Sequence, residues 1–278
     1  MAYARNGDVR LYFDTVGDPA DPALLLISGL GRQCINYRDE FCQGLAARGY
    51  FVVRFDNRDV GLSTKSHELS PPDAPYLVSD MARDAVAVLD ELGIHRAHVW
   101  GASMGGMIAQ AMAIEHGERL LSLTSMMSTT GDPDVGQPTP AARELLHAPR
   151  PSDRESYVAL RVAQENVWGS PDCRDVDRQV AWAVEAFERN FYPRGVGRQY
   201  RAIRRSGSRT AQLARVSVPT LVVHGDCDTL IDVSGGRRTA DAIPGARFVV
   251  VEGLGHDYPP EYWDRLMALV HAHLSAVT

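Results

Sequence analysis

Short apolar runs alternate with helical segments through the first 130 residues, and this alternation constrains the fold more than any other feature of the chain. Runs such as Leu24–Ile27 and Phe51–Phe55 have the length and composition of buried strands. Alternating units of this kind join neighbouring parallel strands through right-handed crossovers. We therefore predict an α/β fold, with a mostly parallel sheet flanked by helices.

The individual elements follow from the same pattern and from the glycines that end helices. The predicted strands are Val9–Thr15, paired with a strand near Tyr3, then Leu24–Ile27, Phe51–Phe55, Ala97–Trp100, Leu121–Met127, a strand from Val218, and Phe248–Val251. The predicted helices are Ile35–Arg48, ended by Gly49, a helix with the apolar stripe Met81, Ala85, Val88, Leu89 and Leu92, ended by Gly93, and Met104–His116. A length of 278 residues fits one large α/β domain or two small ones.

The alternation stops at Thr130–Pro140, a segment rich in Gly, Pro and Asp that suits a loop or linker. Between residues 131 and 212 the pattern is helical, with apolar faces at Val158, Val162, Val167, Val180, Val184, Phe187 and Phe191. The strand pattern resumes at Val218. We therefore predict a core formed by residues 1–130 and 213–278. Residues 131–212 are expected to form an all-helical cap, inserted between strands 6 and 7 over the active site.

Ser103 lies in Trp100–Gly106, between a predicted strand and a predicted helix. In that setting Gly-x-Ser-x-Gly is typical of the nucleophile elbow of α/β-hydrolases, a sharp turn that presents the serine hydroxyl above the sheet. The turn requires small residues two positions before and after the serine, and Gly101 and Gly105 meet this requirement. The free amides of a helix N-terminus also favour negative charge there. A helix N-cap is the structural alternative for Ser103.

A nucleophilic serine needs a base and a third group that orients the base, and in α/β-hydrolases the acid and the histidine follow in that order. Asp228 lies a few residues beyond the strand that begins at Val218, and His256 lies in a glycine-rich loop after the last strand. Open α/β sheets carry their sites at the carboxyl ends of strands. We therefore predict a catalytic triad of Ser103, Asp228 and His256.

Other residues are candidates for the acid and the histidine of the triad. Asp226 and Asp232 are alternative acids, although each also suits a turn, as Asp228 itself does. The competing histidines, which we expect to be surface or satisfied polar residues, are His67, His95, His98, His116, His147, His224, His271 and His273.

The chain resembles the serine α/β-hydrolases of the esterase type along most of the predicted core. Phe55–Ser63 is similar to the Asp-x-Arg-Gly-x-Gly-x-Ser turn of that family, with Asp59 in place of the usual glycine. Within the family, Gly17–Leu26, the Arg58–Asp59 pair and Asp84–Asp90 resemble methylesterases of the aclacinomycin type, which remove a methyl ester from an anthracycline polyketide. The resemblance is weak between about residues 130 and 212, so it does not indicate the substrate of this chain.

The loop Ser28–Gly31 follows the predicted strand Leu24–Ile27. In the α/β-hydrolase fold this loop donates one amide of the oxyanion hole, and the residue after the nucleophile donates the other. The expected donors are therefore the backbone amides of Leu30 and Met104. The family more often has His-Gly where this chain has Ser28 and Gly29, but a backbone donor needs no particular side chain. A Gly-x-Gly-x-x-Gly nucleotide site fails here, because Cys34 occupies the third glycine position.

The predicted reaction is a two-step acyl transfer at a carboxylic ester, with no cofactor and no metal. Aromatic residues of the cap are expected to contribute to the substrate pocket and to favour bulky or flat acyl groups. The candidates for substrate binding are Trp168, Trp182, Phe187 and Tyr192. Phe191 and Tyr200 are two more aromatics of the same segment.

Several other functions stay open at this point. Carbon–carbon bond hydrolases, lactonases and cofactor-free perhydrolases or haloperoxidases would use the same triad. A non-catalytic receptor for a small ligand on the same scaffold could also keep all three residues, and turnover of p-nitrophenyl acetate would distinguish it. Ser103 argues against epoxide hydrolases and haloalkane dehalogenases, which share the fold but have Asp at this position.

Composition sets the expected partners and location. A net charge of −6 argues against nucleic acid or an anionic membrane as a partner. The start of the chain lacks an apolar signal core, and no run approaches the length of a membrane span. The four cysteines have no metal-type spacing and are expected to be reduced thiols. We therefore expect a cytoplasmic enzyme that binds a small hydrophobic ester, and a homodimer is left open.

Overall fold

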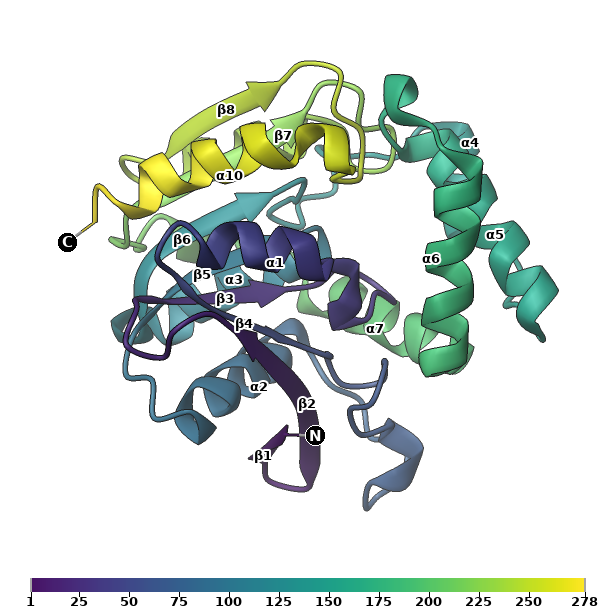
Figure 1. Cartoon of the computed structure of the whole chain (residues 1–278), viewed down its shortest axis with the longest axis horizontal. Coiled ribbons are helices and arrows are strands. Elements are labelled where there is room, and N and C mark those ends of the chain that lie inside the picture. Colours follow the sequence, from purple (N-terminus) through teal and green to yellow (C-terminus); the bar gives the residue numbers. More distant parts are fainter. Residues whose placement is uncertain (1, 278) are drawn as a thin grey trace.

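The computed structural model describes residues 2–277 and contains one eight-stranded sheet with helices on both faces (Figure 1). Its strand order is β1-β2-β4-β3-β5-β6-β7-β8. The strands are β1 (Ala2–Asn6), β2 (Val9–Val16), β3 (Ala23–Ile27), β4 (Phe51–Phe55), β5 (Ala97–Ala102), β6 (Leu120–Met126), β7 (Thr220–Gly225) and β8 (Arg247–Val251). The hairpin β1–β2 and the pair β2–β4 are antiparallel, and all other neighbours are parallel. The predicted α/β class and mostly parallel sheet are confirmed.

Each central strand feeds two apolar cores, because successive side chains point to opposite faces of a sheet. In β3, Leu25 and Ile27 join the core that contains α2 (Val78–Glu91) and α3 (Met104–Glu115). Leu24 and Leu26 join the core on the other face. That second core contains side chains of α1 (Asp39–Ala46) and α10 (Pro260–Leu274), while the end of α9 (Ser234–Ala242) packs with the first.

The predicted helix Ile35–Arg48 is wrong at its start. Cys34–Asn36 forms a single 3-10 turn, the chain then extends at Arg38, and α1 begins only at Asp39. The break depends on Tyr37, whose ring is buried and whose carbonyl accepts a hydrogen bond from the Arg54 guanidinium instead of continuing a helix. This contact comes from a distant strand, so local periodicity did not reveal it.

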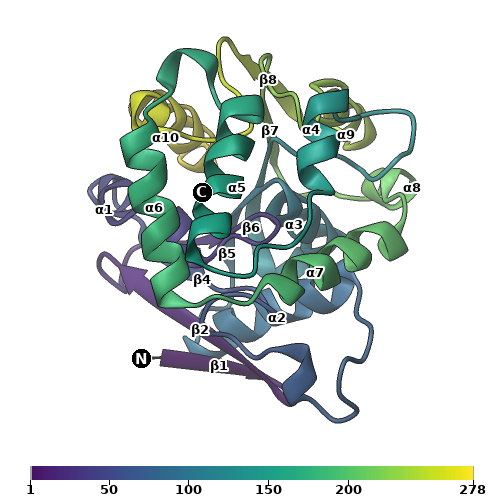
Figure 2. The ribbon, with the colours of Figure 1, turned by 90° about the vertical axis from the view of Figure 1, so that its right-hand side faces the viewer.

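Between β6 and β7 the described residues form helices and no strand. The helices are α4 (Pro140–Leu146), α5 (Arg154–Trp168), α6 (Val176–Arg189), α7 (Pro193–Ser206) and the short α8 (Thr210–Leu213). Helices α4 to α7 lie beyond the carboxyl ends of the parallel strands, and Figure 2 looks straight at them. We call residues 131–212 the helical insertion.

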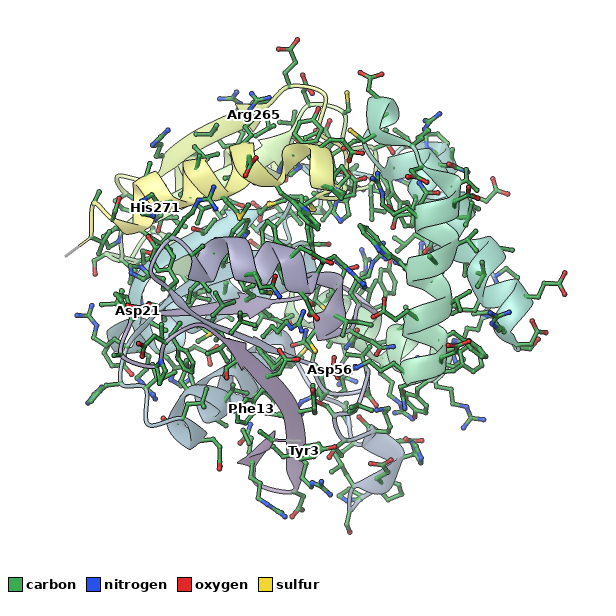
Figure 3. All side chains as sticks on the ribbon, in the orientation of Figure 1. Tyr3, Phe13, Asp21, Asp56, Arg265 and His271 are labelled. Carbon is green, nitrogen blue, oxygen red and sulfur yellow. The ribbon has the colours of Figure 1, made fainter. Side chains whose placement is uncertain are left out.

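A buried ion pair joins the insertion to the sheet. Asp56 directly follows β4 and lies between the sheet and the insertion (Figure 3). Its carboxylate accepts hydrogen bonds from the Arg189 guanidinium of α6 at 2.7 Å and from the amides of Cys34 and Leu62 at 2.7 and 2.8 Å. Because these donors come from three separate segments, Asp56 fixes α6 relative to the loops that follow β3 and β4.

A second buried ion pair joins the turn after β4 to α2. The fully buried Asp84 carboxylate accepts hydrogen bonds from Arg58 at 2.6 and 2.7 Å and from the Asn6 amide at 2.9 Å. The neighbouring Asp59 has φ +67°, a conformation that glycine adopts most readily, which agrees with the glycine of the family pattern. The Asp59 carboxylate accepts hydrogen bonds from the Ser66 amide at 2.7 Å and the Tyr76 hydroxyl at 2.8 Å.

Removing the Asp84 carboxylate should destabilise the fold strongly. In Asp84→Ala the buried Arg58 guanidinium loses its counter-charge, which typically costs about 3–5 kcal/mol of unfolding free energy. The control is Asp90→Ala on the same helix, because Asp90 is largely exposed and pairs with Arg119 at the surface. Its expected cost is below about 1 kcal/mol. Urea unfolding of both variants measures the difference, and equal losses would contradict this account.

Candidate active site

Ser103 occupies a sharp turn between β5 and α3. Its backbone has φ +58° and ψ −121°, a conformation that is rare for any residue with a side chain and costs on the order of 1–3 kcal/mol. The turn is tight enough to exclude side chains on both flanks. A Cβ atom at Gly101 would lie 2.0 Å from the carbonyl oxygen of Gly105, and one at Gly105 would lie 1.9 Å from that of Ile27. Both glycines are therefore required where the sequence pattern has them.

The structure brings Ser103, His256 and Asp228 together in a chain of hydrogen bonds. His256 Nε2 is 2.9 Å from Ser103 Oγ, and His256 Nδ1 is 2.6 Å from Asp228 Oδ2. The three residues follow β5, β8 and β7, whose parallel course brings their carboxyl ends to one edge of the sheet. Asp228 and His256 are buried. A hydroxyl, an imidazole and a carboxylate in this order can pass a proton from serine to histidine and stabilise the resulting cation.

Asp228 is held as a carboxylate by several donors. Its Oδ1 atom accepts hydrogen bonds from the amides of Leu230 and Ile231 at 2.9 and 2.8 Å. Burial acts to raise its pKa, but the charge of His256 and the hydrogen bonds of His224 and His256 outweigh burial and lower the pKa to about 2. His224 is fully buried in β7, with Nε2 3.3 Å from the Asp228 carboxylate and 2.8 Å from the carbonyl oxygen of Ile231. Sequence reasoning did not identify this contact.

The rival acids occupy turns. The exposed Asp226 accepts a hydrogen bond from the Gly253 amide at 2.7 Å, and the exposed Asp232 accepts one from the Ser234 amide at 2.9 Å. Neither has a hydrogen bond to His256 among residues 2–277. The geometry therefore separates Asp228 from both of them.

The two expected oxyanion donors flank Ser103. Met104 directly follows it as the first residue of α3, and Leu30 follows Gly29, where a Cβ atom would lie 3.1 Å from Cβ of Ser103. Among the described residues neither amide has a hydrogen-bond partner in the protein, whereas the next amide, that of Gly31, donates to Gln199 at 2.8 Å. Two unpaired amides beside a serine hydroxyl are suited to an oxyanion.

A cavity of about 240 Å³ opens over Ser103 and His256, and the helical insertion forms its outer wall. Of the four aromatics expected there, Trp168 and Trp182 line it. Phe187 does not: its ring packs against Phe191, with ring centroids 4.6 Å apart. Tyr192 also lies elsewhere, with its hydroxyl 2.8 Å from Nδ1 of His67. Helical spacing alone did not reveal which face of α6 meets the cavity.

Sequence reasoning also missed the polar wall of this cavity. Side chains on one face of α5, at helical spacing, line it together with Arg32 from the loop after β3. These α5 residues are Tyr157, Leu160, Arg161, Gln164, Glu165 and Trp168. The spacing was visible in the sequence, but a charged stripe on a helix is normally a solvated face, and only the packing shows that this one is turned inward.

The loop that carries His256 is bonded to the insertion. The Asp257 carboxylate accepts hydrogen bonds from the amide and hydroxyl of Ser170 at 3.0 and 2.5 Å, and the Ser170 hydroxyl accepts one from Gly255 at 2.9 Å. The His256 amide donates to the carbonyl of Trp168 at 2.5 Å. Burial and the nearby charge of Glu165 raise the pKa of Asp257 to about 6, although Ser170 acts to lower it.

Asp257 should make stability depend on pH. Its carboxyl has the ordinary pKa of 3.8 in the unfolded chain and a pKa of about 6 in the folded protein. Ionisation of this carboxyl therefore destabilises the folded protein by roughly 1.4 kcal/mol for each unit of pKa difference. Relative to Asp257→Asn, the unfolding free energy of the natural protein should therefore fall as pH rises from about 4 to about 6. Urea titrations across this range test it, with the exposed Asp264→Asn as a control. A difference that does not change with pH would contradict the assignment.

A family model described as the alpha/beta hydrolase fold matches residues 22–259. The chain belongs to the α/β-hydrolase fold family. Two curated relatives of this hydrolase span almost its whole length: rhodomycin D methylesterase DauP of Streptomyces sp. (strain C5) is 35% identical, and rhodomycin D methylesterase DnrP of Streptomyces peucetius is 34% identical. Both matches cover 98% of this chain and 97% of the relative.

Solved structures agree with the fold. The enol-lactonase from Burkholderia xenovorans LB400 superposes with a TM-score of 0.79 at 25% identity, covering 99% of this chain and 100% of the other. The predicted membership of the esterase-type hydrolases, with a resemblance to anthracycline methylesterases, is confirmed by these matches. No helix within residues 2–277 combines the length and apolar character needed to cross a lipid bilayer.

Proposed function

We propose that this hydrolase cleaves a carboxylic ester through an acyl-enzyme formed on Ser103. The observation that carries the proposal is the hydrogen-bonded chain from Ser103 Oγ through His256 to the Asp228 carboxylate, at 2.9 and 2.6 Å. In this mechanism Ser103 attacks the ester carbonyl while His256 takes its proton and then returns it to the leaving alcohol. Water, activated by His256, afterwards releases the acid. Asp228 orients the imidazole and stabilises its cation throughout.

The developing oxyanion is assigned to the amides of Leu30 and Met104. Backbone amides that are held in place beside the reacting atom need no reorganisation during the reaction, which is why such donors lower the barrier. The strained backbone of Ser103 supports the same reading, because strain of this kind persists where the surrounding packing enforces it.

In this proposal the helical insertion, residues 131–212, is a cap that closes the site over a core of residues 1–130 and 213–278. Its position over the carboxyl ends of the strands and its contribution to the cavity wall support this division. Trp168 and Trp182 are assigned to substrate binding, since both line the cavity. Phe187 is assigned to the packing of the cap itself, and Tyr192 to joining the cap to the core through His67.

The substrate class proposed is a methyl ester on a polycyclic, polyketide-like acid. The two rhodomycin D methylesterase relatives support it, and so does the presence of Trp168 and Trp182 in the cavity wall, because aromatic side chains suit a flat ring system. The same triad would also open a lactone, so a screen of methyl esters and lactones of aromatic acids, with p-nitrophenyl acetate as a general ester, identifies the preferred bond.

Ser103→Ala should fold normally and lose ester hydrolysis by about 10³-fold or more. Release of methanol from a methyl ester measures the loss, and the melting temperature checks the fold. Because Ala removes only the hydroxyl, the remaining rate reports the oxyanion hole and binding alone. Near-natural turnover by the purified variant would remove Ser103 from the mechanism.

Asp228→Asn should cost far more activity than Asp226→Asn, since only Asp228 contacts His256. An amide cannot stabilise the imidazolium, and we expect a loss of roughly 10²–10⁴-fold in kcat/KM for Asp228→Asn against less than about threefold for the exposed control. Steady-state kinetics with one ester compares the two variants. Equal losses, or the larger loss at Asp226, would reassign the acid.

A further inference from the structure

The cavity side of α5 carries polar and charged side chains among apolar and aromatic ones. Arg161, Gln164 and Glu165 line the cavity, while Val158 and Val162 line an open groove against α6. An ordinary amphipathic helix turns a mainly apolar stripe inward. Placing charged groups where they are partly shielded from water costs solvation free energy unless each gains a partner there.

Arg161 is the member of this wall that lacks a full set of partners. Its Nη1 atom donates to Oε1 of Gln164 at 3.1 Å. Its Nη2 atom is buried and has no hydrogen-bond partner among residues 2–277. Leaving such a donor unpaired is costly, and buried donors in native proteins are nearly always satisfied.

Glu165 does not satisfy this donor. Its Oε1 atom is hydrogen-bonded to the Arg32 guanidinium and lies 3.7 Å from Nη2 of Arg161, beyond hydrogen-bond range. The order along the helix, with the cation four residues before the anion, is also the weaker of the two arrangements. The other carboxylate of the wall, Asp257, is hydrogen-bonded to Ser170. Two other arginines that line the cavity also have carboxylate partners: Arg38 pairs with Glu185, and Arg178 pairs with Glu261.

We infer that Arg161 binds an anionic oxygen, a carboxylate or a phenolate, on the acid part of the ester. The inference rests on the proposed ester hydrolysis and names a substrate feature that it leaves undefined. A planar guanidinium with a free edge suits such an oxygen, because charge-assisted hydrogen bonds of this type are about twice as strong as neutral ones. Gln164 accepts a hydrogen bond from the other nitrogen, Nη1, and Glu165 forms an ion pair with Nη2 at 3.7 Å that leaves its hydrogen-bonding capacity unused.

The helix also sets the length of the substrate. Arg161 precedes Trp168 by seven residues, which is about 10 Å along the helix axis. The carbonyl of Trp168 contacts the backbone of His256, so this end of α5 lies at the reaction centre. The backbone of Arg161 therefore lies about two helical turns from the end of α5 that contacts His256, and the proposed substrate has its anionic oxygen at a distance of this order from the scissile carbonyl. A rigid acid of two or more rings spans this distance, and a short acyl group does not.

The test compares matched pairs of methyl esters that differ only at the far end. The carboxylate arm uses the monomethyl and dimethyl esters of para-linked biphenyl dicarboxylic acid. The phenolate arm uses the methyl esters of hydroxybiphenyl and methoxybiphenyl carboxylic acid, assayed above the pKa of the phenol. The natural enzyme should favour the anionic member of at least one pair by roughly tenfold or more in kcat/KM. The pair that shows this preference tells whether the bound oxygen belongs to a carboxylate or to a phenolate.

Arg161→Gln should reduce that preference by roughly tenfold or more, mainly through KM of the anionic ester. Arg161→Lys keeps the charge and should retain an intermediate preference, which covers the case in which the glutamine variant does not fold. The matched control is Arg143→Gln, an exposed arginine of α4 that does not line the cavity, and it should leave the preference unchanged. A preference that persists in both Arg161 variants, or is absent in the natural enzyme, overturns the inference while ester hydrolysis stands.

A binding measurement separates this inference from the proposed reaction. Titration calorimetry of the Ser103→Ala variant with biphenyl dicarboxylate and with hydroxybiphenyl carboxylate at the same high pH needs no turnover. Adding Arg161→Gln should weaken binding of at least one of the two by roughly tenfold or more. Unchanged affinity for both would overturn the inference even if no ester were hydrolysed, and loss of hydrolysis with this binding effect intact would count against the reaction alone.

Discussion

The close approach of Gly105 to the carbonyl of Ile27 is the contact on which the rest of the site depends. Helix α3 can begin immediately after β5 only because neither Gly101 nor Gly105 carries a side chain. This packing holds Ser103 in its strained conformation, next to the loop after β3 and at the carboxyl edge of the sheet. Strands β7 and β8 end at the same edge. The loops that follow them bring Asp228 and His256 into a hydrogen-bonded chain with Ser103.

Local pattern was enough to predict most of this framework. The central strands are buried along nearly their whole length and are mainly apolar, because both of their faces are covered. The glycine spacing around Ser103 reflects the steric requirement of the sharp turn. The order of the three polar residues along the chain then placed Asp228 and His256 in the loops where the structure has them. The prediction was wrong where a residue distant in sequence determines the local structure. At Tyr37 the predicted helix is interrupted, and the carbonyl oxygen accepts a hydrogen bond from Arg54 of β4.

The cavity wall was the least predictable part, because each helix of the insertion has two faces and the sequence does not say which one the core covers. The aromatic spacing in α6 suggested Phe187 as a pocket residue, yet its ring packs against Phe191. The charged stripe of α5 resembled a solvated surface, yet it faces the site. Both outcomes depend on how the insertion docks. That docking is fixed by polar contacts such as Arg189 with Asp56 and Ser170 with Asp257, which join residues far apart in sequence.

The central claim is that the fold makes one serine hydroxyl nucleophilic, and covalent labelling tests it most directly. A fluorophosphonate ester reacts with a serine only where a base removes the proton and donors stabilise the oxyanion. Intact-protein mass spectrometry should show one phosphonyl group added per chain, and peptide mapping should locate it on Ser103. The rate should fall sharply in Asp228→Asn and hardly change in Asp226→Asn. Labelling of a different serine, or ester turnover that persists in protein that takes up no label, would contradict the account.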